Sequence, residues 1–247
     1  MSKKLSVITV VYNGEFFLES AIKSVVDQKK EDVEYIIIDG ASTDSTMQII
    51  EKYKNYIDVI ISEPDNGIYD AMNKGVEKAS GEYVVFLNSD DYYDDGVLQS
   101  CLDTISLKPD AVIMNTIIEN GEGVKKVFKR INDKNKYKLY IRIPFMHPSV
   151  VVKKEVFNQI GGFDLAFKIA SDCDFLMKML GKINTISYID EGVVMRAGGI
   201  SDTCFKDGRK EYKEIYSKYS GNILGAWIGY IESMSFYYLH KFLKVFK

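Results

Sequence analysis

The sequence predicts an α/β fold in which a Rossmann-like, mostly parallel central sheet is flanked by helices, followed by a mixed second half and a C-terminal helical appendage. Between residues 5 and 88, short runs rich in Val and Ile alternate with segments of helical spacing, which is typical of a parallel sheet covered on both faces. After about residue 108 the alternation stops, and apolar runs flank a pair of glycines. That second pattern indicates an antiparallel hairpin.

The first half supplies four strands and three helices. The strands are expected at residues 5–12, 33–39, 57–62 and 82–88, and the helices at 16–28, 42–53 and 68–79. Ser42, Thr43 and Asp44 are predicted to cap the second helix. Acidic residues follow three of the strands: Asp39, Glu63 with Asp65, and Asp90 with Asp91. Because ligands of parallel sheets bind beyond the carboxyl ends of the strands, we expect these carboxylates to converge on one crevice.

The second half is predicted to contain a hairpin, a further strand and two helices. The hairpin joins residues 110–120 to 123–131, the strand covers 148–154, and the helices cover 154–160 and 171–182. Gly161 and Gly162 end the first of these helices. We expect one domain over residues 1–218, with halves at 1–107 and 108–218, and an amphipathic helix over 219–247.

Composition excludes several functional classes. The formal charge of −3 does not indicate a nucleic-acid partner, which would require a strongly basic face. Cys101, Cys173 and Cys204 are odd in number and widely spaced, so neither a disulfide framework nor a zinc site is expected. No segment has the pattern of a secretory signal peptide, and we therefore expect a cytoplasmic protein.

The stretch "FLNSDDYYDD" places four carboxylates directly after a buried strand. Asp90 and Asp91 are hard oxygen ligands of the kind that suit Mg²⁺ or Mn²⁺ carried by substrate phosphates. A solvated acidic loop is the alternative for this pair. For Asp94 and Asp95 the solvated loop is the favoured interpretation, since Gly96 and a helical run follow.

Other polar residues are candidates for ligand contacts. Asp39, at a strand end, can accept hydrogen bonds from a base or a ribose hydroxyl. Asn66 lies in a turn that leads into a helix, where it can act as a cap, and Lys74 either binds phosphate or belongs to a solvated face. His147 precedes a proline and is interpreted either as a structural residue or as a neighbour of phosphate or metal.

Two carboxylates occupy the first turn of the helix predicted at 171–182. Asp172 and Asp174 there complement the helix dipole. Residues two positions apart on a helix do not point the same way, so one of them can face the crevice while the other does not. A helix start holds a carboxylate in a fixed place, which a catalytic base requires.

Taken in order, five stretches resemble family 2 inverting glycosyltransferases of the GT-A fold, and most closely the small bacterial branch of colanic-acid type that assembles polysaccharides. They are "SVITVVYNGEFFLESAIKSVVDQ", "EYIIIDGASTDST", "SEPDNGIYDAMNKGVEKASGEYVVFLNSDD", "HPSVVVKKEVFNQIGGFD" and "ASDCDF". The resemblance covers about residues 4–200. It implies that residues 1–107 bind a nucleotide sugar and that residues 108–218 form the acceptor side.

The resemblance also implies residue roles. Tyr12 and Asp39 would line the nucleotide-base pocket, Asn66 would contact the donor, and Lys74 and His147 would assist at the diphosphate. Asp91 would be the metal ligand, Asp90 would hold the sugar or ribose, and Asp172 would be the base. Asn88 stands at the first position of the metal motif, and Ser171 replaces the glutamate that usually precedes the base.

The resemblance implies a single displacement with inversion, in which a sugar moves from a nucleotide-diphosphate donor to a hydroxyl of a glycan or lipid-linked acceptor. The reaction would belong to surface polysaccharide synthesis and would be aided by Mn²⁺ or Mg²⁺. A non-catalytic sugar-nucleotide-binding or assembly protein on the same fold is the alternative. A nucleotidyltransferase would require a Gly-rich phosphate loop after the first strand, whereas "VVYNGEFF" has one glycine there.

The C-terminal tail is rich in aromatic residues and ends in several lysines. Apolar residues between 224 and 246 fall near one helical face, but Glu232, Ser233 and His240 interrupt the run, which argues against a membrane-spanning helix. One interpretation is an amphipathic helix lying on the inner face of the plasma membrane. The others are packing on the protein's own core or on a homodimer partner.

Overall fold

The structure is a computed structural model that describes residues 3–120, 122–128, 145–199 and 203–245. Side chains are described as far as residue 235. The end of the predicted hairpin, at 129–131, lies outside the described residues.

A mixed sheet runs through the molecule in the order β3-β2-β1-β4-β8-β6-β9-β5, with β7 paired to β6. Its first half is parallel and consists of β1 (Leu5–Val11), β2 (Val33–Asp39), β3 (Val59–Ser62) and β4 (Tyr83–Phe86). Its second half consists of β5 (Tyr92–Tyr93), β6 (Ala111–Glu119), β7 (Lys125–Phe128), β8 (Val150–Lys153) and β9 (Ile186–Arg196). Strand β8 runs antiparallel to both β4 and β6, and β7 runs antiparallel to β6. The predicted parallel first half and mixed second half are both confirmed.

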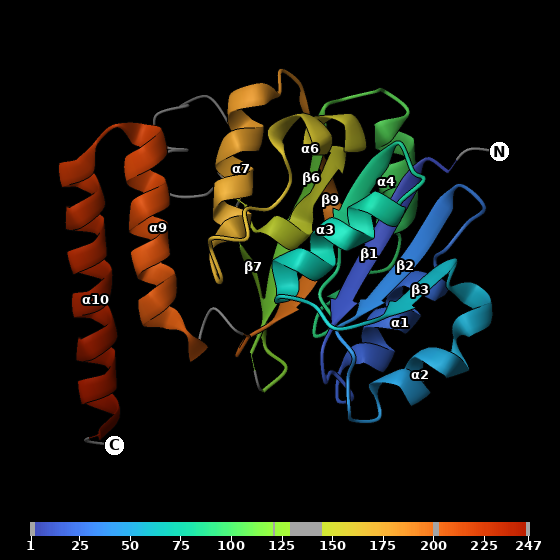
Figure 1. The fold of residues 1–247 in the computed structure, drawn as a ribbon, viewed down its shortest axis with the longest axis horizontal. Coiled ribbons are helices and arrows are strands. Elements are labelled where there is room, and N and C mark those ends of the chain that lie inside the picture. The colour runs from blue at the N-terminus through green and yellow to red at the C-terminus, as the bar shows by residue number, and fades with distance from the viewer. Residues whose placement is uncertain (1–2, 121, 129–144, 200–202, 246–247) are drawn as a thin grey trace.

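Helices cover both faces of this sheet (Figure 1). One face packs on α1 (Leu18–Val26), α2 (Thr46–Lys52) and α4 (Val97–Ile105), and the other on α3 (Ile68–Lys78), α6 (Lys154–Ile160) and α7 (Ser171–Lys182). Short 3-10 turns occur at η1 (Lys54–Tyr56) and η2 (His147–Ser149). Within each strand, successive side chains point to opposite faces, so they pack alternately against one helix layer and the other. Gly161 adopts a left-handed conformation with φ 81°, which confirms the predicted end of α6.

The start of α2 differs from the prediction. The helix begins at Thr46, and Asp44 Oδ1 accepts a hydrogen bond of 2.9 Å from the Thr46 N–H. Ser42 and Thr43, which were predicted to cap this helix, instead bond to Asn13 in the loop after β1, at 2.8 and 2.9 Å. The capping prediction is therefore confirmed for Asp44 and wrong for the other two residues, whose hydroxyl and N–H tie neighbouring loops together.

The C-terminal appendage is a pair of helices. Helix α9 (Phe205–Ser220) lies between α7 and α10 (Ile223–Val245), and Gly221, with φ 65°, makes the turn between them (Figure 1). Because α9 continues to Ser220, it crosses the boundary predicted at residue 218. The separate helix α9 was not predicted from the sequence. Within the described residues, no helix combines the length and apolarity that crossing a bilayer requires.

Candidate active site

The register of the parallel strands brings polar side chains together at one edge of the sheet. Asp39 pairs with Val11 of β1 on one side and with Ser62 of β3 on the other. The Ser62 hydroxyl donates to Asp39 Oδ2 at 2.6 Å, and the Ser42 N–H approaches the same oxygen at 3.1 Å. A carboxylate offers about four acceptor positions, so Asp39 retains capacity for at least one further donor.

The loops around this edge contact one another. A Cβ atom on Gly40 would lie 2.5 Å from Asp65 Oδ2 and 3.4 Å from Tyr12 Cδ2, so glycine allows this close approach. Tyr12 is 65% exposed and presents a ring on which a flat base can stack. The structure therefore brings Tyr12 and Asp39 into one neighbourhood, and the role that the resemblance implies for them at a nucleotide base stays a prediction.

Asn66 and Lys74 lie beside this neighbourhood and share one partner. Both the backbone N–H and the side-chain amide of Asn66 donate to Asp70 Oδ2, at 2.9 and 3.3 Å. The Lys74 ammonium lies 2.9 Å from Glu63 Oε1 and 3.6 Å from Asp70 Oδ2. A phosphate at Lys74 would therefore have to compete with two carboxylates.

The acidic pair follows β4 and its two carboxylates have different environments. Asp91 is 2% exposed and accepts hydrogen bonds from the Arg196 backbone N–H and the Asn88 amide, both at 3.1 Å. Burial, and next the charge of Asp90, raise the pKa of Asp91 to about 7. Asp90 is partly buried, and burial raises the pKa of its carboxyl group as well. Two neighbouring carboxylates with raised pKa values are stabilised in the charged form by a cation.

The residues of this loop fit a hard divalent cation. Asn88 Oδ1 is buried and has no hydrogen-bond partner, while its amide nitrogen lies 3.1 Å from Asp91 Oδ2. Buried polar atoms normally have partners, and Mg²⁺ or Mn²⁺ prefers oxygen ligands such as these. Among the described residues, no three His, Cys, Asp or Glu side chains form a metal-binding group by themselves. A cation here would therefore complete its coordination with water and substrate phosphates, as Mg²⁺ commonly does.

Arg196, at the end of β9, holds the acidic loop in place and was not predicted. In addition to its backbone contact with Asp91, its Nη1 atom donates to the backbone oxygen of Asp90 at 2.6 Å. The guanidinium lies over the rings of Tyr92 and Phe17, at 4.6 and 4.9 Å from their centroids. No sequence signal links positions about a hundred residues apart. Only the pairing of β5 with β9 brings Arg196 to this loop.

Asp172 stands in the first turn of α7, as predicted. Its Oδ1 atom accepts a hydrogen bond of 2.8 Å from the Cys173 N–H and lies 3.2 Å from the Tyr69 hydroxyl of α3. Burial raises the pKa of the Asp172 carboxyl group, which makes its ionised form a stronger base. Asp174 points elsewhere, is fully buried, and forms ion pairs with Lys178 and Lys218. The two carboxylates of this turn therefore have the separate environments that the sequence predicted.

His147 lies in an aromatic cluster. Its ring centroid is 5.0 Å from that of Phe86 and 5.1 Å from that of Phe163, and the side chain is 4% exposed. Burial lowers the pKa of His147 to about 3, so the ring is neutral at physiological pH and offers a diphosphate no positive charge. This placement agrees with the structural interpretation of His147, and its role beside a diphosphate stays a prediction.

Comparisons with known proteins identify the family. Residues 6–171 match the family described as glycosyl transferase family 2. The chain is 39% identical over 102 residues to a putative teichuronic acid biosynthesis glycosyltransferase, TuaG, of Bacillus subtilis, and this match covers 40% of each protein.

Solved structures show the same fold. The crystal structure of S. aureus TarS 1-349 in complex with UDP-GlcNAc matches with a TM-score of 0.68 and 22% identity, over 94% of this chain and 71% of that chain. The mannosyltransferase PcManGT of Pyrobaculum calidifontis, in complex with GDP-Man and Mn²⁺, matches with a TM-score of 0.66 and 16% identity, over 88% of this chain and 64% of that chain. The chain therefore belongs to glycosyl transferase family 2, and it is a glycosyltransferase with the GT-A fold that its sequence predicts.

Proposed function

We propose that the protein is an inverting glycosyltransferase that moves a sugar from a nucleotide-diphosphate donor to a hydroxyl group of a glycan or lipid-linked acceptor in surface polysaccharide synthesis. The observation that carries this proposal is Asp172, a carboxylate fixed at a helix start with a raised pKa. The UDP-GlcNAc and GDP-Man bound by the two structural neighbours support a nucleotide-sugar donor. The predicted halves, 1–107 for the donor and 108–218 for the acceptor, remain part of this proposal.

The residues at the sheet edge divide the work of binding. Tyr12 stacks on the base, and Asp39 accepts a hydrogen bond from the base or ribose. Asn66 and Lys74 contact the donor where its phosphates approach α3. Asp90 holds the sugar or ribose, and Asp91, with Asn88 Oδ1 beside it, would hold a divalent cation. A bound Mn²⁺ or Mg²⁺ would neutralise the charge that develops on the departing diphosphate.

Asp172 performs the proton transfer. It takes the proton from the acceptor hydroxyl as that oxygen forms its bond to the anomeric carbon, and the bond to the nucleoside diphosphate breaks on the opposite face. Attack opposite the leaving group inverts the anomeric configuration. The protonated Asp172 then passes its proton to water. Its raised pKa suits it to this role, because a general base works best when its pKa is close to the working pH.

A thermal-shift panel tests the donor site. We expect one class among UDP-, GDP-, CMP- and dTDP-sugars to stabilise the protein, and only when Mn²⁺ or Mg²⁺ is present. At a ligand concentration of 100 times Kd, binding contributes about 2.7 kcal/mol, which corresponds to a rise in Tm of about 5–10 °C for a protein of this size. EDTA should remove the shift. A folded protein that responds to none of these ligands would contradict the proposed donor site and favour a non-catalytic assembly role, whereas turnover by Asp172→Asn separates catalysis from sugar-nucleotide binding alone.

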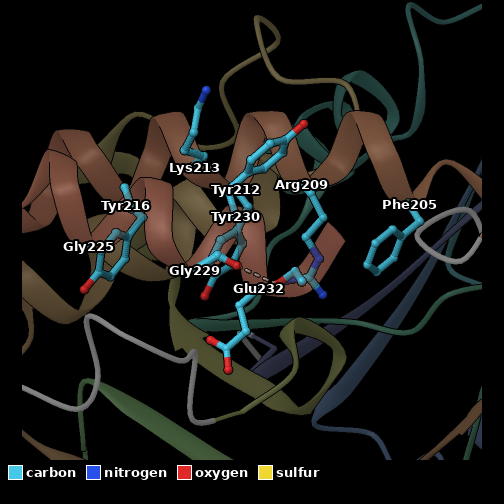
Figure 2. Close-up of a pocket in the computed structure, with 11 residues that line it drawn as sticks. Phe205, Arg209, Tyr212, Lys213, Tyr216, Gly225, Gly229, Tyr230 and Glu232 are labelled. Atoms are coloured by element: carbon cyan, nitrogen blue, oxygen red, sulfur yellow. Dashed lines mark hydrogen bonds between the residues drawn. The ribbon is translucent and has the colours of Figure 1, made fainter. Parts of the chain in front are cut away.

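We also propose that α10 lies on the surface of an anionic membrane. Large apolar side chains along one face of this helix are exposed: Ile223, Leu224, Trp227, Ile228 and Ile231. A groove of about 670 Å³ lies along the junction of α9 and α10. Figure 2 shows Arg209 and Lys213 of α9 and Tyr230 of α10 around it. The Lys213 ammonium lies 3.7 Å from the centroid of the Trp227 ring. In the part of the chain that the structure describes, no salt bridge joins Arg209 or Lys213 to a carboxylate. Apolar side chains flanked by cations and aromatic rings are typical of helices at anionic bilayer surfaces.

Vesicle flotation tests this surface. The protein is expected to bind vesicles that contain phosphatidylglycerol and to bind pure phosphatidylcholine vesicles more weakly. Leu224→Glu combined with Ile228→Glu should weaken binding by at least about tenfold, because two charges would enter the bilayer interface. Leu107→Glu is the matched control, since Leu107 is 77% exposed and lies outside α10. Equal binding by the double variant would contradict the proposal, as would a stable dimer in sedimentation that the same double variant abolishes.

A further inference from the structure

A carboxylate from α9 anchors the segment that precedes the helix of Asp172. Three consecutive backbone N–H groups, those of Lys168, Ile169 and Ala170, donate to Glu211 at 2.9, 2.9 and 2.8 Å. Both carboxylate oxygens of Glu211 take part. Hydrogen bonds to an ionised carboxylate are the stronger kind, so this anchor fixes the backbone of residues 168–170.

The anchored segment connects directly to Asp172. The Ile169 carbonyl accepts a hydrogen bond of 2.7 Å from the Tyr69 hydroxyl, and that hydroxyl lies 3.2 Å from Asp172 Oδ1. The Ala170 carbonyl accepts hydrogen bonds from the first turn of α7, including one of 3.0 Å from the Cys173 N–H. The Cys173 N–H also donates to Asp172 Oδ1. A displacement of residues 168–170 would therefore move the groups that hold the Asp172 carboxylate.

Helix α9 lies beside α7 (Figure 1) and is docked on it through a small buried cluster. Ile215 is fully buried and packs in one cluster with Cys173 and Met177 of α7. Gly208 allows α9 to approach the anchored segment, because a Cβ atom there would lie 3.1 Å from Ile169 Cγ2. The Tyr219 hydroxyl donates to the buried Asp174 at 2.8 Å. The position of Glu211 is thus set by contacts on both sides of it along the helix.

We propose that Glu211 is a positioning residue for transfer: from α9, it holds residues 168–170 so that Asp172 faces the acceptor hydroxyl. This inference rests on the proposed role of Asp172 as the base. It gives α9, a helix that the sequence did not predict, a part in the active site.

The charge of Glu211 has a second effect. Among the described residues, Tyr69 from α3 and Glu211 from α9 are the titratable side chains that act on Asp172 from neighbouring elements. Burial is the main cause of the raised Asp172 pKa, and the negative charge of Glu211 adds to it. Removing this charge while part of the anchor is kept, as in Glu211→Gln, should lower the Asp172 pKa, so the acid limb of the rate profile should move to lower pH. A residue that only stabilised the fold would not move that limb.

Amide hydrogen exchange tests the anchor without reference to activity. In full-length Glu211→Ala, the amides of Lys168, Ile169 and Ala170 should exchange at least about tenfold faster, because they lose hydrogen bonds to a charged acceptor. In Glu211→Gln, which retains one accepting oxygen, the exchange rates of these amides should lie between those of Glu211→Ala and those of the wild type. Glu214→Ala is the matched control, since Glu214 is exposed on the same helix. Unchanged exchange in Glu211→Ala would overturn the proposal.

Kinetics then test positioning, with the donor identified by the thermal-shift panel. We expect Glu211→Ala to lower kcat by about 10–100-fold, in line with the effect of a misplacement of about 1 Å, and to leave donor Kd within about twofold. We expect Glu211→Gln to move the acid limb to lower pH. Faster exchange with unchanged kcat and pH profile would overturn the positioning role. If Asp172→Asn leaves transfer intact, the failure belongs to the proposed base, and the exchange result still reports on the anchor.

Discussion

Replacing Asp172 with asparagine is expected to lower kcat for sugar transfer by about 10²–10⁴-fold, which is the usual contribution of a general base. Asparagine has nearly the same shape, and its carbonyl oxygen can keep the hydrogen bond from the Cys173 N–H that Oδ1 accepts in the wild type. It cannot accept the proton of the acceptor hydroxyl. Donor Kd should therefore stay within about twofold of the wild type. Release of the nucleoside diphosphate under steady-state conditions measures the first quantity, and calorimetry measures the second.

A matched substitution controls for the loss of a helix-start carboxylate. Glu155 is an exposed acidic residue in the first turn of α6, so Glu155→Gln should leave kcat unchanged. Full transfer by Asp172→Asn, with an unaltered pH profile, would contradict the assignment of the base. Loss of transfer in both variants would indicate that helix-start charge matters for folding, and the Tm values would show this.

The pH dependence of Asp172 has two consequences with opposite directions. Its pKa is raised above the ordinary carboxyl value of 3.8, and the base works in its ionised form, so kcat/KM should fall as pH decreases through the raised pKa. The free energy of unfolding changes in the opposite direction, because ionisation of this carboxyl group destabilises the fold. A carboxyl group whose pKa is higher in the folded than in the unfolded state favours the fold when protonated, and it destabilises the fold progressively as pH rises above the unfolded value. Asp172→Asn should therefore be at least as stable as the wild type at pH 8, although it is inactive.

The sequence predicts those parts of the molecule that depend on local patterns. Continuous β-branched runs locate β1 and β2 because both faces of a parallel sheet are buried. The helix predicted at 171–182 has the same bounds in the structure, and Gly161 ends α6 where the pattern places it. The acidic residues do follow β2, β3 and β4, and their convergence on one ligand site stays a prediction.

Other features depend on contacts between distant segments. Helix α9 is a polar helix in which Ile215 is the fully buried hydrophobic residue, so its periodicity gives a weak signal. Arg196 reaches the acidic loop, and Glu211 reaches the start of α7, only through tertiary packing. The Ser42 hydroxyl has the chemistry of a helix cap, but it accepts a hydrogen bond from the Asn13 N–H of a neighbouring loop instead. Local propensity cannot resolve such competition, because both outcomes satisfy the same hydrogen-bonding groups.

The largest expected effect on ligand binding is at Asp91. Asp91→Asn removes the charge that we propose to hold the cation, and it leaves one oxygen where two now accept hydrogen bonds from Arg196 and Asn88. Mn²⁺ affinity should fall by at least about 100-fold. A tenfold change in affinity corresponds to about 1.4 kcal/mol, and breaking a buried charge pair commonly costs about 3–5 kcal/mol. Titration of free Mn²⁺ by electron paramagnetic resonance measures this directly.

Asp90→Asn should behave differently, because Asp90 is assigned to the sugar or ribose. Mn²⁺ binding should be largely retained, whereas the metal-dependent thermal shift by the donor should decrease. Asp94→Asn, just after β5, is the control and should match the wild type in both measurements. If Asp90→Asn loses Mn²⁺ and Asp91→Asn keeps it, the two roles are exchanged. If both variants bind Mn²⁺ like the wild type, the acidic pair is not the metal site. The like charges after β4 would then be stabilised by Arg196, whose charge acts on both carboxyl groups and whose Nη1 donates to the Asp90 backbone oxygen.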